Sequence, residues 1–262
     1  MSIADRYPYK PTVALLFMVY DQIDHEAIWD EWLRGHADKF HVFVHSKHPV
    51  RIGLKSVPVT VVPSIPTEWG TFSLVEAQVQ LLNHALDRHS AMKFVFLSNS
   101  CIPVKEVDVV YDELISTYPS NILLSNPTQV FPRYDAVKLP EKDNIVKHSQ
   151  WTILNRPHAS YITMHLKTMR DAYADVIIPD ESAFGTFIKI GYGFEGQVDT
   201  TRPTTAVDWE HGDPSYYHDI SSRTLAHLIN QSPSLFARKF HPHCTVDDTQ
   251  SLLTFLRREE VL

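Results

Sequence analysis

Residues 93–103 read Lys-Phe-Val-Phe-Leu-Ser-Asn-Ser-Cys-Ile-Pro, and this stretch decides the fold class. Lys93–Leu97 is rich in apolar residues and predicts a buried strand, which runs into the polar turn Ser98–Pro103. A helix precedes it at Ser73–Leu86, where leucines and alanines recur on one face. Ser73 and Glu76 have the spacing of a capping box at the start of that helix. The stretch therefore predicts a helix followed by a strand that ends in a polar turn.

The same alternation of strand and helix extends through the first half of the chain. The predicted strands are Val13–Tyr20, His41–His45, Val57–Val62 and Asn121–Leu124, and the further predicted helices are Asp24–Leu33 and Val107–Tyr118. This order predicts an α/β fold with a mostly parallel central sheet and helices on both faces. Ligands bind beyond the carboxyl ends of such strands, so Tyr20-Asp21, His45–Lys47 and Ser98–Ser100 are candidate site segments. The alternative for each is an ordinary polar loop.

The second half is less regular. Residues Pro157–Tyr173 predict one helix, Val176–Ile178 a short apolar segment, and Glu181–Ile190 a further helix. A short helix is predicted at Thr224–Ile229. No repeat or low-complexity linker interrupts the chain, so residues 1–262 are expected to form a single domain.

Composition excludes several classes. The chain of 262 residues carries a formal net charge of −7, which argues against nucleic-acid binding through bulk charge. The apolar run Val13–Tyr20 is far shorter than the roughly 20 residues that span a bilayer. The first ten residues lack the apolar core of a signal peptide, so a soluble protein is expected. The two cysteines, Cys101 and Cys244, are expected to be free thiols, although their spacing does not exclude a pair.

Two charged groups stand out as candidates for chemistry. Asp180 fits the N-cap of a helix, and Glu181 at its first turn could act as a general base. The alternative is that these carboxylates only complement the helix dipole. Arg238 and Lys239 lie between Phe236 and Phe240 and could neutralise a diphosphate, or they could be a solvated basic pair.

Other motifs are weaker. Asp208 and Trp209 offer a carboxylate beside a flat aromatic face, an arrangement that suits sugars. No D-x-D triplet exists, and the nearest segments are Asp24-His25-Glu26 and Asp208-Trp209-Glu210. His241–Cys244 resembles part of a zinc site but lacks a fourth ligand at motif spacing. Gly191–Gly196 matches G-x-G-x-x-G formally, but it follows a helix pattern and predicts a helix stop and a turn.

Taken in order, a series of segments resembles the core-2/I-branching glycosyltransferase family. The segments are Val13–Tyr20, His41–His45, Trp69–Ala77, Phe96–Pro103, Lys147–Trp151, Pro179–Glu181, Val207–Trp209 and Leu235–Phe240. The resemblance implies a GT-A type, Rossmann-like nucleotide-sugar-binding fold, a UDP-sugar donor and inversion at the anomeric carbon. It also implies that no divalent metal and no other cofactor is required.

The resemblance assigns roles to particular residues. Glu181 matches the family's general base and Lys239 its diphosphate-binding lysine. Arg202 is the nearest counterpart of a second diphosphate-binding cation, although it stands about two residues from the aligned place. Ser46 replaces an acidic residue that often helps to hold the nucleotide. The missing membrane anchor implies a cytoplasmic enzyme of a prokaryote or of a virus-infected cell, similar to a large-virus xylosyltransferase.

These considerations give a complete hypothesis for the site. Tyr20 and Ser46 are expected at the nucleotide, and Ser98 and Asn99 near the sugar or phosphates. The remaining substrate-binding residues are expected to be Trp69, Trp151, Asp208 and Trp209. The expected donor sugar is xylose, with N-acetylglucosamine next, and the acceptor is an oligosaccharide or a glycoprotein. Two alternatives stay open: a non-catalytic sugar- or nucleotide-binding protein, and a metal-dependent nucleotide hydrolase using Asp24, Glu26 and Asp208.

Overall fold

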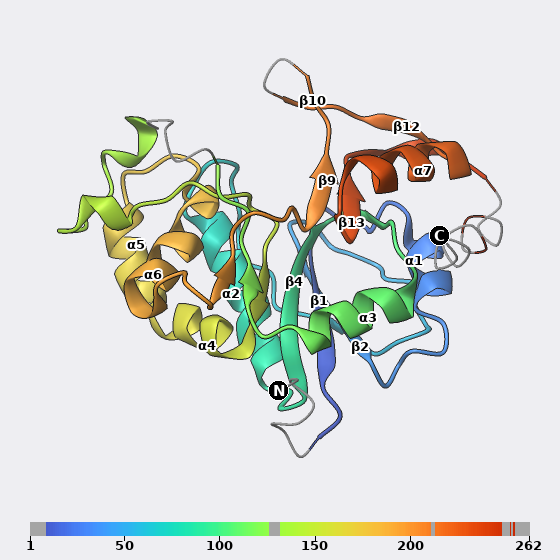
Figure 1. The fold of residues 1–262 in the computed structure, drawn as a ribbon, viewed down its shortest axis with the longest axis horizontal. Helices are drawn as coiled ribbons and strands as arrows, with labels where there is room; N and C mark the ends of the chain where they lie inside the picture. The colour runs from blue at the N-terminus through green and yellow to red at the C-terminus, as the bar shows by residue number, and fades with distance from the viewer. Residues whose placement is uncertain (1–8, 126–131, 211–212, 248–251, 253, 255–262) are drawn as a thin grey trace.

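A sheet of seven strands forms the centre of the protein, in the order β3-β2-β1-β4-β7-β6-β8 (Figure 1). This computed structural model describes residues 9–125, 132–210, 213–247, 252 and 254. The strands of the sheet are β1 (Thr12–Val19), β2 (Phe40–Ser46), β3 (Val59–Val61), β4 (Ala91–Ser98), β6 (Ser120–Asn121), β7 (Ile153–Asn155) and β8 (Val198–Asp199). Every neighbouring pair is parallel except the two that involve β7, so the mostly parallel sheet expected from the sequence is confirmed.

The order of the strands reverses beside β1. From β1 the chain moves outward to β2 and β3, and it then returns to place β4 on the other side of β1. Parallel sheets leave a crevice at the carboxyl ends of the strands where such a reversal occurs. Val19 and Ser98 end the two strands that border this reversal, so the crevice opens at these residues.

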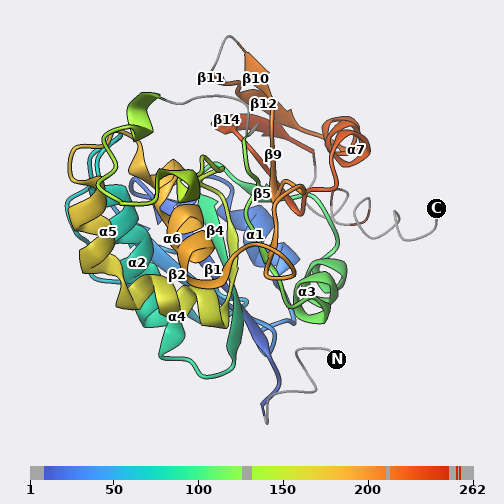
Figure 2. The ribbon, with the colours of Figure 1, turned by 60° about the vertical axis from the view of Figure 1, so that its left-hand side comes forward.

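Helices cover both faces of the sheet, as predicted (Figures 1 and 2). Val13, Leu15 and Phe17 of β1 point to the core beneath α1 (Glu26–Trp32) and α3 (Val107–Ser116), whereas Ala14 and Leu16 point to the opposite core. That second core packs under α2 (Ser73–Leu86), α4 (Arg156–Met164), α5 (Leu166–Tyr173) and α6 (Ala183–Tyr192). The near-continuous apolar sequence of β1 follows from this burial on both sides.

A smaller layer lies across the carboxyl ends of the central strands (Figure 1). It holds a three-stranded sheet of β5 (Ile102–Pro103), β13 (Phe236–Arg238) and β9 (Thr205–Val207). Two further strand pairs are β10 (Trp209–Glu210) with β11 (Asp213–Pro214), and β12 (Tyr217–Ile220) with β14 (Phe240–Val246). The helix α7 (Ser222–Gln231) follows β12. This layer brings the last fifth of the described chain over the crevice.

Several local predictions were wrong. The Ser73–Glu76 capping box does not form. The N-cap of α2 is Phe72, whose ring has no hydrogen-bond acceptor, and the Ser73 hydroxyl is bonded to Thr71 and Glu68. The helix predicted at Pro157–Tyr173 is two helices that meet at His165. The helix predicted at Glu181–Ile190 is instead a 3₁₀ turn, η4 (Pro179–Glu181), followed by α6, which begins at Ala183.

Two other predictions, on the glycine-rich motif and on the cysteines, were confirmed. α6 ends at Tyr192, and Gly193 and Gly196 follow with positive φ, so the glycine-rich motif is a helix stop and a turn. Both cysteines are free thiols. Within the described residues, no group of three or more His, Cys, Asp or Glu side chains could hold a metal, so the zinc-like cluster is not assembled. No helix in this part of the chain combines the length and hydropathy needed to cross a bilayer.

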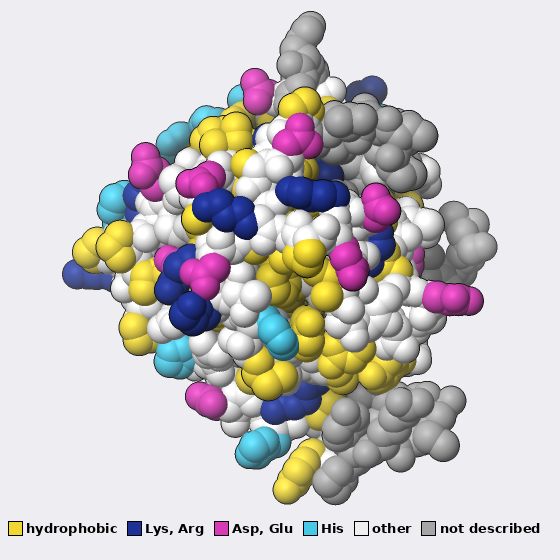
Figure 3. All heavy atoms as spheres, turned by 90° about the vertical axis from the view of Figure 1, so that its left-hand side faces the viewer, with side chains coloured by type: hydrophobic (Ala, Val, Ile, Leu, Met, Phe, Trp, Pro, Cys, Tyr) yellow, Lys and Arg dark blue, Asp and Glu magenta, His cyan; other side chains and the backbone are white. Residues whose placement is uncertain are grey.

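The outer face over α4, α5 and α6 is a mixed surface. Met164 and Tyr192 remain well exposed there, and Figure 3 shows hydrophobic side chains interspersed with basic and acidic ones. The features that position a site lie instead at the carboxyl ends of the strands.

Candidate active site

Two adjoining cavities open at the carboxyl ends of the central strands. The first, here called the strand-end cavity, has a volume of about 630 Å³ and is bordered by the ends of β1, β2 and β4. The second, the outer cavity, has a volume of about 880 Å³ and lies between residues 123–125, β9 and α7. The residues that line both cavities are Lys147, Gln150, Trp151, Glu181, Trp209 and Arg238. The wall between the cavities therefore carries a carboxylate and two cations.

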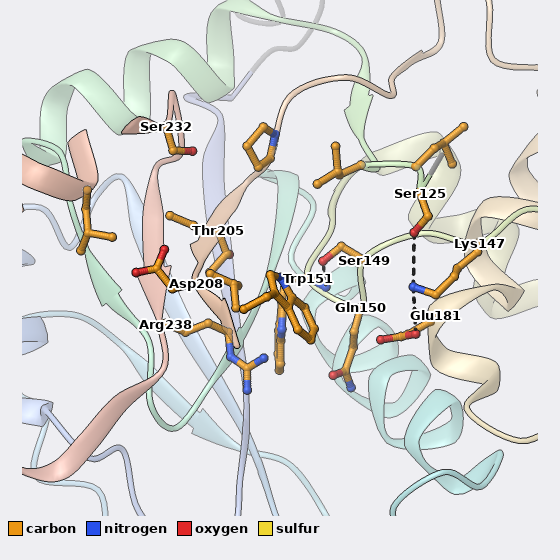
Figure 4. A pocket seen from close by; sticks show the side chains of 17 residues that line it. Ser125, Lys147, Ser149, Gln150, Trp151, Glu181, Thr205, Asp208, Ser232 and Arg238 are labelled. Atoms are coloured by element: carbon orange, nitrogen blue, oxygen red, sulfur yellow. Dashed lines mark hydrogen bonds and ion pairs between the residues drawn. The ribbon is translucent and has the colours of Figure 1, made fainter. Parts of the chain in front are cut away.

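Glu181 occupies the end of η4 and lines both cavities. Figure 4 shows its carboxylate in the outer cavity, beside Lys147. Its Oε2 lies 3.2 Å from Lys147 Nζ and 3.9 Å from Arg133 Nη1. Lys147 Nζ in turn donates to Ser125 Oγ at 3.2 Å. These contacts orient the carboxylate at the junction of the two cavities.

His148 fixes the backbone on which Glu181 stands. The N–H of His148 donates to the Glu181 carbonyl at 2.8 Å. The imidazole is fully buried: Nδ1 donates to the Ser149 carbonyl, and Nε2 accepts from the Gly185 N–H at 3.1 Å. A Cβ at Gly185 would lie only 2.6 Å from His148 Cδ2, so the absence of a side chain allows this approach. Burial lowers the pKa of His148 to about 4, which keeps the ring neutral.

Asp180 differs from its neighbour. The sequence predicts it as a helix N-cap, and this is wrong: α6 starts from Ser182, and Asp180 Oδ1 is buried without a hydrogen-bond partner in the described structure. Burial raises the pKa of Asp180 to about 7. Its side chain lines the strand-end cavity beside Glu181.

Arg238 is a half-buried cation at the wall between the cavities. Its guanidinium carbon lies 4.7 Å from the centre of the Trp151 ring (Figure 4). Its Nε is buried and has no hydrogen-bond partner among the described residues. The Thr204 hydroxyl donates to the Trp151 carbonyl at 2.7 Å, which fixes the segment that carries this ring. Burial lowers the pKa of Arg238. A desolvated guanidinium of this kind is a strong receptor for an anion.

Lys239 lies in the strand-end cavity, with its Nζ 4.3 Å from the centre of the Tyr216 ring. The flanking Phe236 and Phe240 are fully buried and anchor the segment. The segment is not one continuous strand, since β13 ends at Arg238 and β14 begins at Phe240. Glu181 and Lys239 thus line the same cavity, although 57 residues separate them in the chain.

Most of the other expected residues also reach the cavities. Tyr20, Trp69, Ser98 and Asn99 line the strand-end cavity, and Asp208 lines the outer cavity. Trp69 and Trp209 are 78% and 62% exposed, so their rings are available at the rim.

Ser46 and Arg202 are not among the residues that line either cavity. Ser46 is buried, and its neighbours His45 and Lys47 line the strand-end cavity in its place. Arg202 Nη2 is ion-paired with Glu113 Oε1 at 2.5 Å and donates to the Pro233 carbonyl at 2.8 Å. The geometry gives no support for a diphosphate contact by Arg202, because Glu113 and Pro233 engage its guanidinium.

The carboxylates expected for a hydrolase do not converge. Asp24 accepts a hydrogen bond from the Asn99 amide, and Glu26 accepts from the backbone of Gly53 and Leu54. Asp208 lines the outer cavity, whereas neither Asp24 nor Glu26 does so. The described residues therefore do not form the metal cluster on which that alternative depended.

Arg133 and Lys147 are residues of the site that the sequence did not single out. Arg133 belongs to a short 3₁₀ turn, η2 (Pro132–Tyr134), in a stretch with no motif. Lys147 stands at the start of the segment Lys147–Trp151, which was noted only as a part of the family pattern.

Comparison with known proteins places these features in context. A family model described as Core-2/I-Branching enzyme matches residues 13–231. The chain is 31% identical over 166 residues to Glycosyltransferase BC10 of Oryza sativa subsp. japonica, covering 59% of this chain and 41% of that protein. It is 26% identical over 217 residues to Xylosyltransferase oxt of Drosophila pseudoobscura pseudoobscura, covering 67% of this chain and 24% of that protein. The chain thus spans less than half the length of either curated relative.

A solved structure is also similar. It is that of a glycosyltransferase involved in the glycosylation of the major capsid of PBCV-1, with a TM-score of 0.46 and 10% sequence identity. The alignment covers 86% of this chain and 94% of that one. At this TM-score the likeness adds no argument to those drawn from the site.

Proposed function

Because this chain belongs to the Core-2/I-branching enzyme family, we propose that it is an inverting glycosyltransferase with a GT-A type fold. It moves a sugar from a UDP-sugar to a hydroxyl of a glycan. One observation carries this proposal: Glu181 and the cations Arg238 and Lys239 line the same cavity at the carboxyl ends of the sheet. A base and an anion receptor in one cavity are the two groups that such a transfer needs.

The donor occupies the strand-end cavity. Tyr20, Ser98 and Asn99 stand at the ends of β1 and β4, where nucleotides bind in sheets of this topology. The diphosphate lies against Arg238 and Lys239. The acceptor occupies the outer cavity, where Asp208 accepts hydrogen bonds from its hydroxyls and the exposed ring of Trp209 packs on a sugar face.

The reaction is a single displacement at the junction of the cavities. Glu181 takes the proton of the acceptor hydroxyl while its oxygen bonds to the anomeric carbon of the donor. The bond from that carbon to the diphosphate oxygen breaks on the opposite face, and its electron pair leaves with UDP. Arg238 and Lys239 stabilise the charge that develops on the departing diphosphate. The fixed cations supply the stabilisation that a divalent metal gives in other enzymes.

The donor sugar is proposed to be xylose, with N-acetylglucosamine as the next candidate. The name of the matched Drosophila relative, a xylosyltransferase, supports this choice. The acceptor is proposed to be an oligosaccharide or a glycoprotein, since the outer cavity is larger than the strand-end cavity and is lined by hydroxyls, an amide and two indole rings.

The decisive experiment replaces Glu181 with glutamine. Turnover should fall by about 10² or more, because the amide cannot accept the proton, while UDP affinity measured by calorimetry stays near that of the wild type. Lys239→Ala is the complementary variant and should weaken UDP binding. Wild-type turnover in Glu181→Gln would remove the glutamate from the role of base.

A second candidate is a non-catalytic UDP-sugar- or glycan-binding protein on the same fold. The observation that favours it is the pairing of the Glu181 carboxylate with Lys147 and Arg133. Thermal shifts and transfer assays over a panel of nucleotide sugars distinguish the two. Stabilisation by UDP-sugars without transfer or donor hydrolysis would identify a binding protein.

A further inference from the structure

Ile178 has an unusual backbone conformation directly before the catalytic turn. Its φ is 56° and its ψ is 52°, which places it in the left-handed helical region. Among the described residues it is the only one other than glycine with a positive φ. A β-branched side chain is strained in this region, where glycine and asparagine are tolerated.

The backbone of Ile178 is held from several directions. Its N–H donates to the Gly70 carbonyl at 2.9 Å, and its carbonyl accepts from the Tyr134 hydroxyl at 3.3 Å. The Glu181 N–H also donates to the Ile178 carbonyl, at 3.4 Å. These bonds explain why the chain turns here, but a glycine could make all of them without strain. The backbone therefore gives no reason for an isoleucine.

The side chain of Ile178 provides such a reason. It is half-buried and lines the strand-end cavity together with Trp69, Asp180 and Glu181. Its Cγ1 lies beside Gly70, 3.9 Å from the place where a Cβ of that residue would stand. The isoleucine thus forms an apolar part of the wall of the cavity that the proposed base also lines.

We propose that the Ile178 side chain contacts the sugar ring of the donor and limits the size of the sugar that the strand-end cavity accepts. This inference rests on the proposed function, since it assumes a UDP-sugar in that cavity. The backbone hydrogen bonds hold the strained conformation, and this conformation places a branched apolar group against the sugar. An apolar contact of one or two methylene groups discriminates between ligands by about 10- to 200-fold.

The test measures binding and therefore needs no turnover. Calorimetry on the wild type and on Ile178→Gly gives dissociation constants for UDP, UDP-xylose, UDP-glucose and UDP-N-acetylglucosamine. Glycine relieves the strain, so the variant should fold, and UDP affinity should change by less than about twofold. The ratio of the dissociation constants for UDP-xylose and UDP-glucose should shift by about tenfold or more in favour of the larger sugar.

Two further variants sharpen the test. Asparagine tolerates the same backbone conformation, and in Ile178→Asn it replaces the apolar wall by a polar one. The ratio of the dissociation constants for UDP-xylose and UDP-glucose should therefore also change in this variant. Ile177→Gly is the matched control, because Ile177 is 63% exposed and adjacent in the chain. The ratio of the dissociation constants for UDP-xylose and UDP-glucose in Ile177→Gly should equal that of the wild type.

The outcomes are distinct. An unchanged ratio in Ile178→Gly, with UDP-sugars still bound, would overturn the role of Ile178 and leave the proposed function intact. A change of this ratio by the same factor in Ile177→Gly would also overturn the role of Ile178, because the effect would then come from a more flexible backbone in this segment. If neither UDP nor any UDP-sugar binds the wild type, the proposed function and this inference both fail. If Glu181→Gln retains turnover while the ratio shifts in Ile178→Gly, Glu181 is not the base, and the role of Ile178 stands.

Discussion

Replacing His148 with glutamine should remove part of the acid sensitivity of folding. The fully buried imidazole has a pKa lowered from 6.5 to about 4, mainly through desolvation. Between these values the unfolded chain binds a proton at this position and the folded protein does not. The stability that the neutral ring contributes is therefore complete above pH 6.5 and is lost as the pH falls towards 4.

The size of the effect follows from the same two values. A difference from 6.5 to about 4 corresponds to about 3 kcal/mol of unfolding free energy. At pH 7 the His148→Gln variant should be less stable by about 1–3 kcal/mol, because a glutamine side chain cannot reproduce both ring bonds, to the Ser149 carbonyl and from the Gly185 N–H, in the same geometry. Since glutamine does not titrate, this deficit should shrink steadily below pH 6.5 and be absent or reversed at pH 4.

Urea unfolding followed by tryptophan fluorescence, at several pH values from 4 to 7.5, measures this difference. Burial also lowers the pKa values of His41 and His158 to about 4, but those residues are present in both proteins and cancel in the comparison. His89→Gln, at an exposed position, is the matched control. If the unfolding free energies of wild type and His148→Gln run parallel across this range, His148 does not have the protonation state described here.

Three further predictions concern the cavities. Arg238→Met should weaken UDP binding by about tenfold or more in calorimetry, because the guanidinium, whose Nε is buried, is the proposed receptor for the diphosphate. Unchanged UDP affinity would contradict this proposal. Asp180→Asn should stabilise the protein against urea by up to about 4 kcal/mol above pH 7 and by little near pH 4. The reason is that the pKa of Asp180 is raised in the folded protein, so the wild type loses stability as the pH rises towards 7. A difference in unfolding free energy between wild type and Asp180→Asn that does not change with pH would contradict the raised pKa. EDTA should leave transfer activity intact, and full loss restored by Mn²⁺ would refute the role given to the cations.

The long elements of the fold could be predicted from the sequence because their patterns reflect burial. The run Thr12–Val19 is apolar on both sides of the strand, and the structure buries it between two helical layers. The ends of the elements were harder to predict, since they depend on contacts made by distant residues. Ser73 has the spacing of a capping box, yet Thr71 and Glu68 bind its hydroxyl.

Residues that line the candidate site were predicted where they stand in a short motif or at the end of a predicted strand. Glu181, Arg238 and Lys239 stand in short charged motifs, and the structure brings them to one cavity. Arg133 gives no such signal, because only the fold shows that it approaches Glu181. Arg202 had the right charge for its expected role, but its partner Glu113 lies on α3, and the sequence contains no information about that contact.

The Arg238–Trp151 pair has a thermodynamic consequence. Both side chains belong to the partition that the two cavities share, so any ligand that alters the hydration or orientation of this pair on one side alters it on the other. Binding energies in the two cavities are then linked, and such linkage is reciprocal. If nucleotide tightens acceptor binding by some factor, acceptor tightens nucleotide binding by that same factor. For the proposed enzyme, the Arg238–Trp151 contact is thus one route, within the wall that both cavities share, by which donor and acceptor would change each other's affinity.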